Sequence, residues 1–368
     1  MNTKQKVHWP VFLFITIYHI LLIVAIPLYL NSYTPSTGLL VYSGVMMFVS
    51  GLGVTAGYHR LMSHCTYKTT RAVEAVLLFF ASVATQGSAL RWCYDHRMHH
   101  SHVDTDEDPY SIKKGFWHAH IIWMFFRTQK IDMKAVSDLN RSPLIRLQHK
   151  YYITCFLVSN FVVIAAAALL FNDWWGAFVW AGLARLFVLH HLTWFINSLA
   201  HTWGSQNYSR EHSAVDSYLL CLLTFGEGYH NYHHTFPQDF RNGIRWYHFD
   251  PTKWLIWSLS KMGLAWNLKR VNDVRIFRQL VQDHAQFLIK KIESSYYSQR
   301  EFLEKRIEEL KEALIRNISN LHQLLSEKSS QIVSRSEIKE LKKTLRTDWR
   351  SWKILVRSIE KNHHLPTA

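Results

Sequence analysis

Cysteine is scarce in this sequence. The four cysteines, Cys65, Cys93, Cys155 and Cys221, show no C-x-x-C spacing, and no haem-binding motif of the cytochrome b5 type is present. This argues against a disulfide framework and against a four-cysteine iron–sulfur cluster, so we expect reduced, packed thiols in a reducing compartment. Redox chemistry on this chain would therefore need electrons from a separate protein.

Acidic residues are also few. Lys and Arg number 42, whereas Asp and Glu number 27, which gives a net charge of +15. A basic balance of this kind suits anionic lipid headgroups or an acidic ligand. Basicity alone does not imply nucleic acid, and no motif that reads RNA or DNA occurs, so we expect no nucleic-acid partner.

Long apolar runs are plentiful. Hydrophobic residues make up 48% of the chain, and they concentrate in four runs, at 9–30, 38–58, 151–171 and 174–199. Each run reaches the ~20 residues that a helix needs to cross a bilayer. The first is too long for the apolar part of a signal peptide and has no small-residue cleavage site, so we expect it to remain as a span.

The flanking charges orient these spans. Basic residues flank them on one side only, at Lys4, Lys6, Arg60, Lys68 and Arg71. The connectors on the other side, 31–36 and 172–174, carry no Lys or Arg. The positive-inside rule then places both termini and the histidine motifs on the cytoplasmic side of a bacterial inner membrane or the endoplasmic reticulum.

Nine histidines occur in short motifs: His59-x4-His64, His96-x2-His99-His100, His201, and His230-x2-His233-His234. One metal ion takes about four to six ligands, so nine imidazoles predict two ions held together. Imidazole suits iron, zinc and copper, and a redox metal gives the better reason to gather so many neutral ligands in a membrane protein. We therefore favour iron.

The spacing of the motifs predicts how they sit on helices. Residues five apart in an α-helix point away from one another, so His59 should end the second span and His64 should lie just beyond it. The spacing of His96, His99 and His100 places three rings on one helical stripe, and the last motif repeats it.

The apolar segment 72–90 is nearly long enough to be a fifth span. A crossing there would put the first and second histidine motifs on opposite sides of the membrane, which shared metals forbid. We expect a re-entrant or interfacial helix below the site, with Gln86 and Ser88 at its polar end.

The motifs around these histidines resemble those of the membrane-bound Δ9 fatty acyl-CoA desaturases, the stearoyl-CoA desaturase family. The matching stretches are YHRLMSHC, DHRMHHS, NSLAHT, GEGYHNYHHTFP and DFRNGIRWYHFDPTKWLIW, within residues 10–270. The order of three histidine motifs with this ending makes the resemblance specific. It implies an O2-dependent di-iron enzyme that introduces a cis double bond at Δ9 of saturated C16–C18 acyl chains.

The resemblance also implies roles for individual residues. All nine motif histidines would bind the two irons, and Asn197 would hold a water at the metal. Gln86, Trp92 and Thr193 would line the bend of the acyl tunnel, Met47 and Gly51 would set its closed end, and Lys113 and Lys114 would contact CoA phosphates. Carboxylates that we expect to accept from imidazole N–H groups are Asp95, Asp104, Asp106, Glu107, Asp108 and Glu227.

One departure from the family concerns the carrier. The family often has Arg two residues before the second histidine motif, where this chain has Tyr94. Acyl-lipid and acyl-carrier-protein substrates therefore stay open beside acyl-CoA, as do a related hydroxylase and a non-catalytic membrane scaffold. The electron donor would be of the ferredoxin, rubredoxin or cytochrome b5 type, and zinc could be misloaded in place of iron.

The resemblance stops near residue 270, and residues 271–368 form a helical extension of a different pattern. Alternating spacings of four and three join Leu303, Ile307, Leu310, Leu314, Leu321 and Leu324, with Asn317 at the missing position. A second stripe joins Ile338, Leu341, Leu345, Trp352 and Ile359. Two arrangements are open: self-association as a coiled coil, or a helical hairpin folded on itself or on the catalytic cap.

These observations predict an all-α integral membrane protein. It would have four transmembrane helices and a cytoplasmic histidine-rich cap in a desaturase domain at 1–270, followed by the helical, partly heptad-patterned tail at 271–368.

Overall fold

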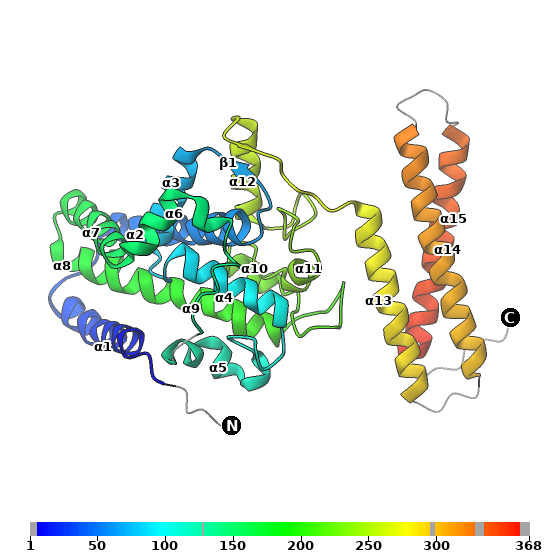
Figure 1. The fold of residues 1–368 in the computed structure, drawn as a ribbon, viewed down its shortest axis with the longest axis horizontal. Helices are drawn as coiled ribbons and strands as arrows, with labels where there is room; N and C mark the ends of the chain where they lie inside the picture. The colour runs from blue at the N-terminus through cyan, green and yellow to red at the C-terminus, as the bar shows by residue number, and fades with distance from the viewer. Residues whose placement is uncertain (1–5, 127–128, 295–298, 328–334, 361–368) are drawn as a thin grey trace. The chain divides into compact units, whose positions relative to one another are not determined.

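The computed structural model describes residues 6–126, 129–294, 299–327 and 335–360 (Figure 1). The chain divides into two compact units. The first unit comprises residues 1–205 and 212–270, and the second comprises residues 206–211 and 271–368. Helices dominate both, as the sequence predicts, and the four cysteines are free thiols.

Among the described residues of the first unit, four helical stretches are long and apolar enough to cross a membrane, which confirms the four predicted spans. Their elements are α1 (Trp9–Ser32), α2 (Thr37–Leu52) continued by the π-helix η1 (Gly53–Ser63), α7 (Tyr152–Phe171), and the run α8 (Trp174–Gly176), η5 (Ala177–Ala184), α9 (Arg185–Ser198) and η6 (Leu199–His201). Ser36 begins the second span by accepting from the backbone N–H of Leu39. Asn172 ends the third in the left-handed conformation.

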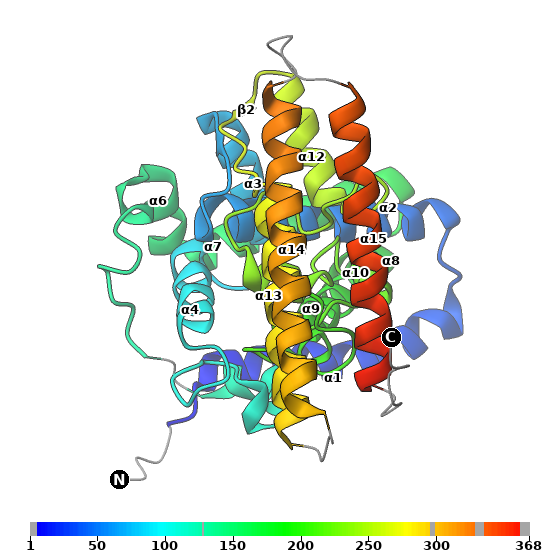
Figure 2. The same cartoon turned by 90° about the vertical axis from the view of Figure 1, so that its right-hand side faces the viewer.

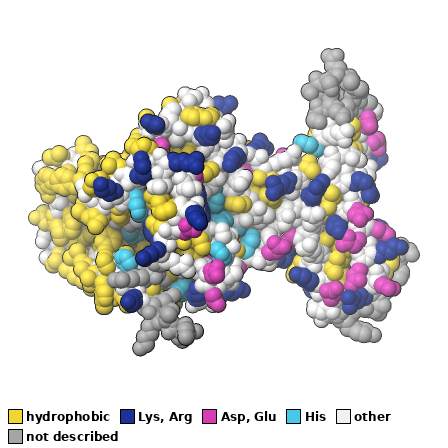
Figure 3. All heavy atoms as spheres, viewed as in Figure 1, with side chains coloured by type: hydrophobic (Ala, Val, Ile, Leu, Met, Phe, Trp, Pro, Cys, Tyr) yellow, Lys and Arg dark blue, Asp and Glu magenta, His cyan; other side chains and the backbone are white. Residues whose placement is uncertain are grey.

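The outer faces of the spans are apolar. In the first unit, hydrophobic side chains gather over α1, α7 and α8 (Figure 3). Ile23 of α1 is 72% exposed and Leu169 of α7 is 73% exposed, among many others on these two helices. Contiguous apolar surface of this extent is stable against lipid and not against water, so the chain is an integral membrane protein.

The segment 72–90 is not a fifth span. Helix α3 (Arg71–Val83) has 13 residues, which is too short to cross the bilayer, and α4 (Ala89–His102) follows it. The connection turns through left-handed Thr85 (φ 55°) and Gly87 (φ 93°). Helix α3 packs against η1, α2 and α7, and its predicted interfacial or re-entrant position stays a prediction.

The remaining elements of the first unit are short and carry the loops of the cap. They are η2 (Ile112–Lys114), α5 (Phe116–His120), η3 (Ile122–Phe125), η4 (Leu139–Arg141), α6 (Pro143–Lys150), α10 (Tyr218–Leu223), α11 (His230–Thr235) and α12 (Pro251–Lys261). Strand β1 (Lys68–Thr69) pairs antiparallel with β2 (Ala265–Trp266), with Lys68 opposite Trp266 and Thr69 opposite Ala265. This pair ties the start of the cap to its end.

The second unit is a three-helix bundle of α13 (Asp273–Ser294), α14 (Arg300–Glu327) and α15 (Arg335–Glu360) (Figure 2). One core joins all three helices and includes Leu288, Leu314 and Trp352. Asn317, the polar interruption of the heptads, donates a 2.7 Å hydrogen bond to Asp348 of α15. The heptad positions are thus covered by helices of the same chain, as in the intrachain alternative, and self-association stays an untested prediction.

Candidate metal centre

All nine motif histidines meet in the structure. Two groups of imidazoles could each hold a metal ion, with the ligand nitrogens of a group within 4.8 Å of one another. The first group contains His59, His64, His96, His100 and His233, and the second contains His99, His201, His230 and His234. His118 and His190 lie outside both groups. Nine imidazoles in two sets agree with two metal ions, as the sequence predicts.

The helices α4 and α11 each serve both groups. On α4, His96 and His100 belong to the first group and His99 to the second; on α11, His233 belongs to the first and His230 and His234 to the second. The rings of His100 and His234 stack at 4.2 Å between ring centres. The two helices therefore link the two histidine groups.

The prediction that His59 ends the second span is wrong in detail. His59 lies inside η1, a π-helix that runs to Ser63, and His64 follows at its end. In a π-helix the backbone hydrogen bond joins residues five apart, and His64 N–H donates to His59 C=O at 3.1 Å. Residues five apart then lie near one face, so both rings join the first group with their centres 4.9 Å apart.

The ligand nitrogens are spaced as they would be around a metal ion. In the first group Nε2 of His233 lies 3.0 Å from that of His59 and 2.9 Å from that of His100. In the second group Nε2 of His230 lies 3.1 Å from those of His201 and His234. With metal–imidazole bonds of about 2.1 Å, ligand nitrogens at right angles lie about 3.0 Å apart, so the residues present fit a metal in each group.

Six of the motif histidines that lie outside the spans favour the neutral form. Burial lowers their pKa well below its usual value, and neighbouring imidazoles lower it further; these are His64, His96, His100, His230, His233 and His234. A neutral imidazole keeps a lone pair on one ring nitrogen. The groups are thus prepared to bind a cation without first losing protons.

Carboxylates orient two of these rings directly. His59 Nδ1 donates to Glu227 and His99 Nδ1 donates to Asp108, each at 2.9 Å. With the proton held on Nδ1, the unprotonated Nε2 faces the metal group. Asp104 contacts a motif histidine only indirectly. It accepts a hydrogen bond from the hydroxyl of Ser213, and that hydroxyl oxygen lies 2.8 Å from His201 Nδ1.

Three other carboxylates do not bind a ligand histidine. Asp95 pairs with Arg91, one turn earlier on α4. Glu107 pairs with His102, which is outside both groups. Asp106 offers its backbone carbonyl to Lys114. The predicted contacts of these three are therefore wrong, because proximity in sequence does not decide which way a side chain points, either on the helix that carries Asp95 or in the loop that follows it.

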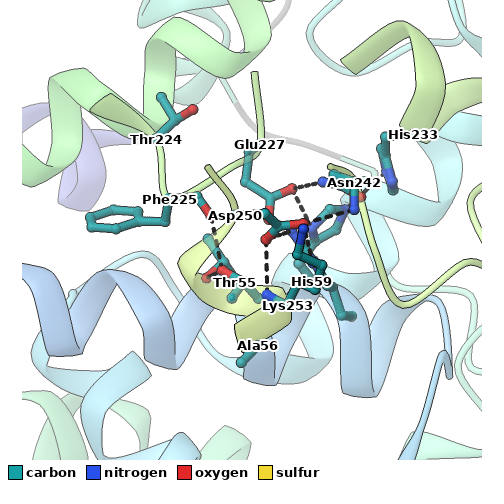
Figure 4. A network of polar contacts seen from close by, with 12 residues as sticks. Thr55, Ala56, His59, Thr224, Phe225, Glu227, His233, Asn242, Asp250 and Lys253 are labelled. Carbon is teal, nitrogen blue, oxygen red and sulfur yellow. Dashed lines mark hydrogen bonds and ion pairs between the residues drawn. The ribbon is translucent and has the colours of Figure 1, made fainter. Parts of the chain in front are cut away.

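A buried charge network supports Glu227 (Figure 4). Arg60 donates to Glu227 at 2.9 Å and pairs with Asp250, and Asn242 donates to the other Glu227 oxygen at 2.7 Å. Burial alone would raise the pKa of Glu227, but its interactions with His59 and Arg60 outweigh burial and lower the pKa to about 2. Glu227 is therefore an anion, and both of its carboxylate oxygens accept hydrogen bonds.

The run DPTKW closes this network from α12. Asp250 caps α12 by accepting from the backbone N–H of Lys253, and the Lys253 ammonium donates to the carbonyls of Gly243, Arg245 and His248 at 2.7 to 3.3 Å. From the sequence, Arg60 was identifiable only as a charge that flanks a span, and no individual role was predicted for Asp250 or Lys253.

Sequence reasoning also missed Ser213 and Tyr110. The Tyr110 hydroxyl lies 3.2 Å from His96 Nδ1, and its ring stacks on His99. Both residues lie outside the histidine motifs. Only their polar character in a stretch near the motifs could have pointed to them.

Two residues assigned to the tunnel bend touch each other. The Gln86 amide donates to the Thr193 hydroxyl at 2.9 Å. Trp92 stacks on His96 with ring centres 4.9 Å apart, and its ring centre lies 6.1 Å from that of His59. These contacts put Trp92 directly against the first histidine group.

The residues assigned to the tunnel end look different from expectation. Met47 packs against the core cluster that contains Phe225. Gly51 leaves room, but the Phe225 ring fills it, because a Cβ on Gly51 would lie 2.3 Å from that ring. Phe225 has a left-handed backbone (φ 59°), and its position over Gly51 was not predicted.

The remaining assigned residues lie at the edge of the site. Lys113 and Lys114 are exposed in η2, and the Lys114 ammonium donates to the carbonyls of Asp106 and Asp108. Asn197 is half-buried in the last turn of α9, and its amide has no hydrogen-bond partner within the described residues. A free amide at this point is suited to hold a water.

A cleft of about 380 Å³ opens at the first histidine group. Its lining includes His64 and His100, together with Arg97, Met98 and Pro237. The cleft gives small molecules a path to these ligands.

Comparison with known proteins agrees with this geometry. A family model described as "Fatty acid desaturase" matches residues 35–269, which include every motif histidine. The chain belongs to the fatty acid desaturase family. The resemblance noted from the histidine motifs is thereby confirmed.

Individual relatives of this chain include fungal and cyanobacterial proteins. It is 42% identical to the "Probable acyl-CoA desaturase" of Schizosaccharomyces pombe over 68% of this chain and 53% of that protein. It is 38% identical to "Acyl-CoA desaturase 1" of Saccharomyces cerevisiae over 72% of this chain and 51% of that protein. It is 33% identical to the "sn-1 stearoyl-lipid 9-desaturase" of Anabaena variabilis over 73% and 96%. The chain thus spans about half the length of the two fungal proteins.

Proposed function

We propose that this protein is an O2-dependent di-iron desaturase that introduces a cis double bond at Δ9 of saturated C16–C18 acyl chains. The observation that carries the proposal is the meeting of nine histidines in two adjoining groups, in a chain of the fatty acid desaturase family. The groups would hold one iron each, and Asn197 would hold a water at the metal centre.

The reaction removes two hydrogens from adjacent methylene groups and reduces O2 to two waters with two electrons and two protons. No protein acid or base can abstract a hydrogen from an unactivated methylene, so bound iron would supply the O2 chemistry. The protein binds and places the chain: Trp92 covers the first histidine group, and the Gln86–Thr193 bond shapes the wall beside it. Glu227 and Asp108 keep the rings of His59 and His99 oriented toward the ions.

The proposed carrier is CoA. The names of the two fungal relatives support an acyl-CoA substrate, whereas the cyanobacterial relative is named for a lipid-bound chain. Lys113 and Lys114 are exposed and could meet CoA phosphates or lipid phosphates. Acyl-lipid and acyl-carrier-protein substrates remain the alternatives.

Electrons would come from a separate protein of the ferredoxin, rubredoxin or cytochrome b5 type. We propose that both termini and the metal centre face the cytoplasm, where such a donor and acyl-CoA are available. Zinc competes well for imidazoles and cannot activate O2, so material loaded with zinc would be inactive without contradicting the proposal.

The function is tested by expressing the full chain in a host that lacks its own desaturase. We expect cis-Δ9 C16 and C18 fatty acids to appear in the total lipid, detected as derivatives by gas chromatography and mass spectrometry. Hydroxylated chains in place of unsaturated ones would favour a related hydroxylase. No modified chain, in cells that contain the iron-loaded protein, would favour a non-catalytic scaffold.

The acyl chain-length preference should respond to Met47 and Phe225. Met47→Trp adds bulk to the face of α2 that meets the Phe225 cluster, and we expect it to shift preference from C18 toward C14 and C16. Phe225→Ala should do the opposite, because it empties the space over Gly51 and each additional buried CH2 contributes about 0.8 kcal/mol. Competition between C14, C16 and C18 substrates measures both effects.

Met46→Trp is the matched control, one position along α2 from Met47. It should leave the product ratio unchanged. Gly51→Trp is a poor test, because any side chain there collides with the Phe225 ring. Unchanged ratios in active Met47→Trp and Phe225→Ala proteins would place the tunnel end elsewhere.

A further inference from the structure

A short piece of the metal-bearing half of the chain belongs to the C-terminal bundle. Residues 206–211 lie between the ligand His201 and the residue Ser213 in the sequence, yet they form one compact unit with α13, α14 and α15. The loop that leaves the fourth span therefore runs into the second unit and returns to the first unit at His212.

The bundle holds this segment through a buried carboxylate. One oxygen of Asp283 in α13 accepts from the backbone N–H of Arg210 at 2.7 Å, and the other pairs with the Arg210 guanidinium. The guanidinium also lies over the ring of Phe287, 4.3 Å from its centre. Gln279, one turn before Asp283, donates to the backbone carbonyl of Tyr208 at 3.3 Å. The segment is thus bound through its backbone and through one side chain.

Asp283 is poorly placed for any other purpose. It is 7% exposed and lies between Val281 and Ala285, both of which are in the core of the bundle. A buried carboxylate is unfavourable unless it is paired and hydrogen-bonded. Its two bonds to Arg210 meet that need, so the pairing with Arg210 stabilises this buried charge.

Three residues beyond Arg210, the chain reaches the outer partner of a metal ligand. The backbone N–H and the hydroxyl of Ser213 both donate to Asp104, at 2.6 Å each. Because the hydroxyl proton is given to Asp104, the Ser213 oxygen accepts from His201 Nδ1 at 2.8 Å. That contact leaves Nε2 of His201 unprotonated toward the four-histidine group.

We propose that the C-terminal extension is a positioning element for the metal centre. Asp283 fixes Arg210, the fixed segment holds Ser213 in register, and Ser213 keeps the His201 ring oriented for its metal. Asp283 and Arg210 are positioning residues and touch neither metal nor substrate. The inference rests on the metal-binding part of the proposed function and extends it to the 271–368 region, which the family model does not cover.

The test measures metal release from the full-length chain loaded with Co²⁺, whose visible absorption reports the geometry of each site. In Asp283→Ala we expect one of the two ions to leave to a chelator roughly tenfold faster, the lower end of the range for losing an outer hydrogen bond to a ligand. The band of that ion should change, while the other ion keeps its wild-type rate. Asp283→Glu retains the negative charge, so its rate of metal release should be close to that of the wild type.

A double variant separates positioning from general destabilisation. With Ser213→Ala already present, Asp283→Ala should add little to the release rate, because the path to His201 is already broken. Glu309→Ala, which removes an exposed ion pair with Arg306 in α14, is the control and should release both ions as wild type does. If Asp283→Ala folds poorly, Asp283→Asn takes its place, because the amide retains the shape of the side chain and one hydrogen-bond acceptor. The same change in metal release is then expected of Asp283→Asn.

Three outcomes would each overturn the proposal. The release rates of both ions could rise equally, the effects of Ser213→Ala and Asp283→Ala on the release rate could add, or a folded Asp283 variant could release its ions at the wild-type rate. Cobalt release does not depend on acyl turnover. Absence of unsaturated product from the wild-type iron protein would therefore count against the proposed function, whereas the ratio of release rates decides the role of the bundle.

Discussion

His233→Ala should abolish turnover and remove metal from the five-histidine group. Its Nε2 is the closest neighbour of two other ligand nitrogens, those of His59 and His100, so its loss opens the middle of the ligand set. Metal chemistry supplies several kcal/mol of transition-state stabilisation, and each 1.36 kcal/mol is a factor of ten in rate. We expect a loss on the order of a thousandfold or more, measured as product per minute and as iron per chain.

His102→Ala is the matched control for this variant. His102 lies on α4 with His96, His99 and His100, but its ring pairs with Glu107 at the surface. It should retain near wild-type turnover and iron. His118→Ala and His190→Ala should also keep most activity per folded molecule, although His190 bonds to Tyr18 and to the Ala84 carbonyl and its loss should lower stability. A His233→Ala protein with normal metal and normal rate would show that the ligand assignment is wrong.

Glu227→Gln should have the second-largest effect. The carboxylate joins His59 Nδ1, Arg60 and Asn242 in a region with almost no exposed surface. The substituted amide carries no negative charge opposite Arg60 and His59. Its NH2 group also points N–H donors at side chains that are themselves hydrogen-bond donors. Breaking a buried pair costs about 3–5 kcal/mol, and loss of an outer partner of a histidine ligand weakens metal binding by roughly 10- to 100-fold.

The prediction has a counterpart on the surface. Glu107→Gln alters a carboxylate that also pairs with a histidine, His102, but the Glu107 side chain is 68% exposed. Exposed pairs contribute about 0–1 kcal/mol, so thermal unfolding and iron content should match wild type. If the two variants behaved alike in unfolding temperature and iron binding, the buried network would not be the support of the metal centre.

The span count and the ligand set could be predicted from the sequence because both depend on local patterns. Apolar runs of sufficient length decide the spans, and the spacing of His96, His99 and His100 on one helix brings three rings to one stripe. The structure adds that neighbouring members of a stripe serve different metal groups, which no spacing rule states. That division depends on how α4 and α11 face each other.

The π-helix at Gly53–Ser63 could not be predicted from helical periodicity. In an α-helix the side chains of His59 and His64 would point away from one another, and the prediction from sequence rested on that geometry. The tertiary environment overrides it, because the wider turn brings both rings to the same group. Wide turns of this kind are rare and occur most often at functional sites, so a motif spaced by five is the signal that could have suggested one.

Side-chain partners across loops were the least predictable feature. Glu227 and Asp108 orient ligand rings as expected, whereas Asp95 and Glu107 pair elsewhere and Ser213 takes part without any sequence signal. Phe225 likewise fills the space over Gly51 from a loop far away in sequence. In each case the outcome depends on backbone positions set by tertiary contacts, and residue type alone does not fix them.

The central claim is tested most directly by single-turnover product analysis of the purified, iron-loaded protein with stearoyl-CoA, O2 and a chemical reductant. Iron per chain is measured on the same sample. The account predicts two irons per chain and oleoyl-CoA with a cis double bond at carbon 9. A protein that holds two irons and returns only stearoyl-CoA or a hydroxylated chain would contradict it.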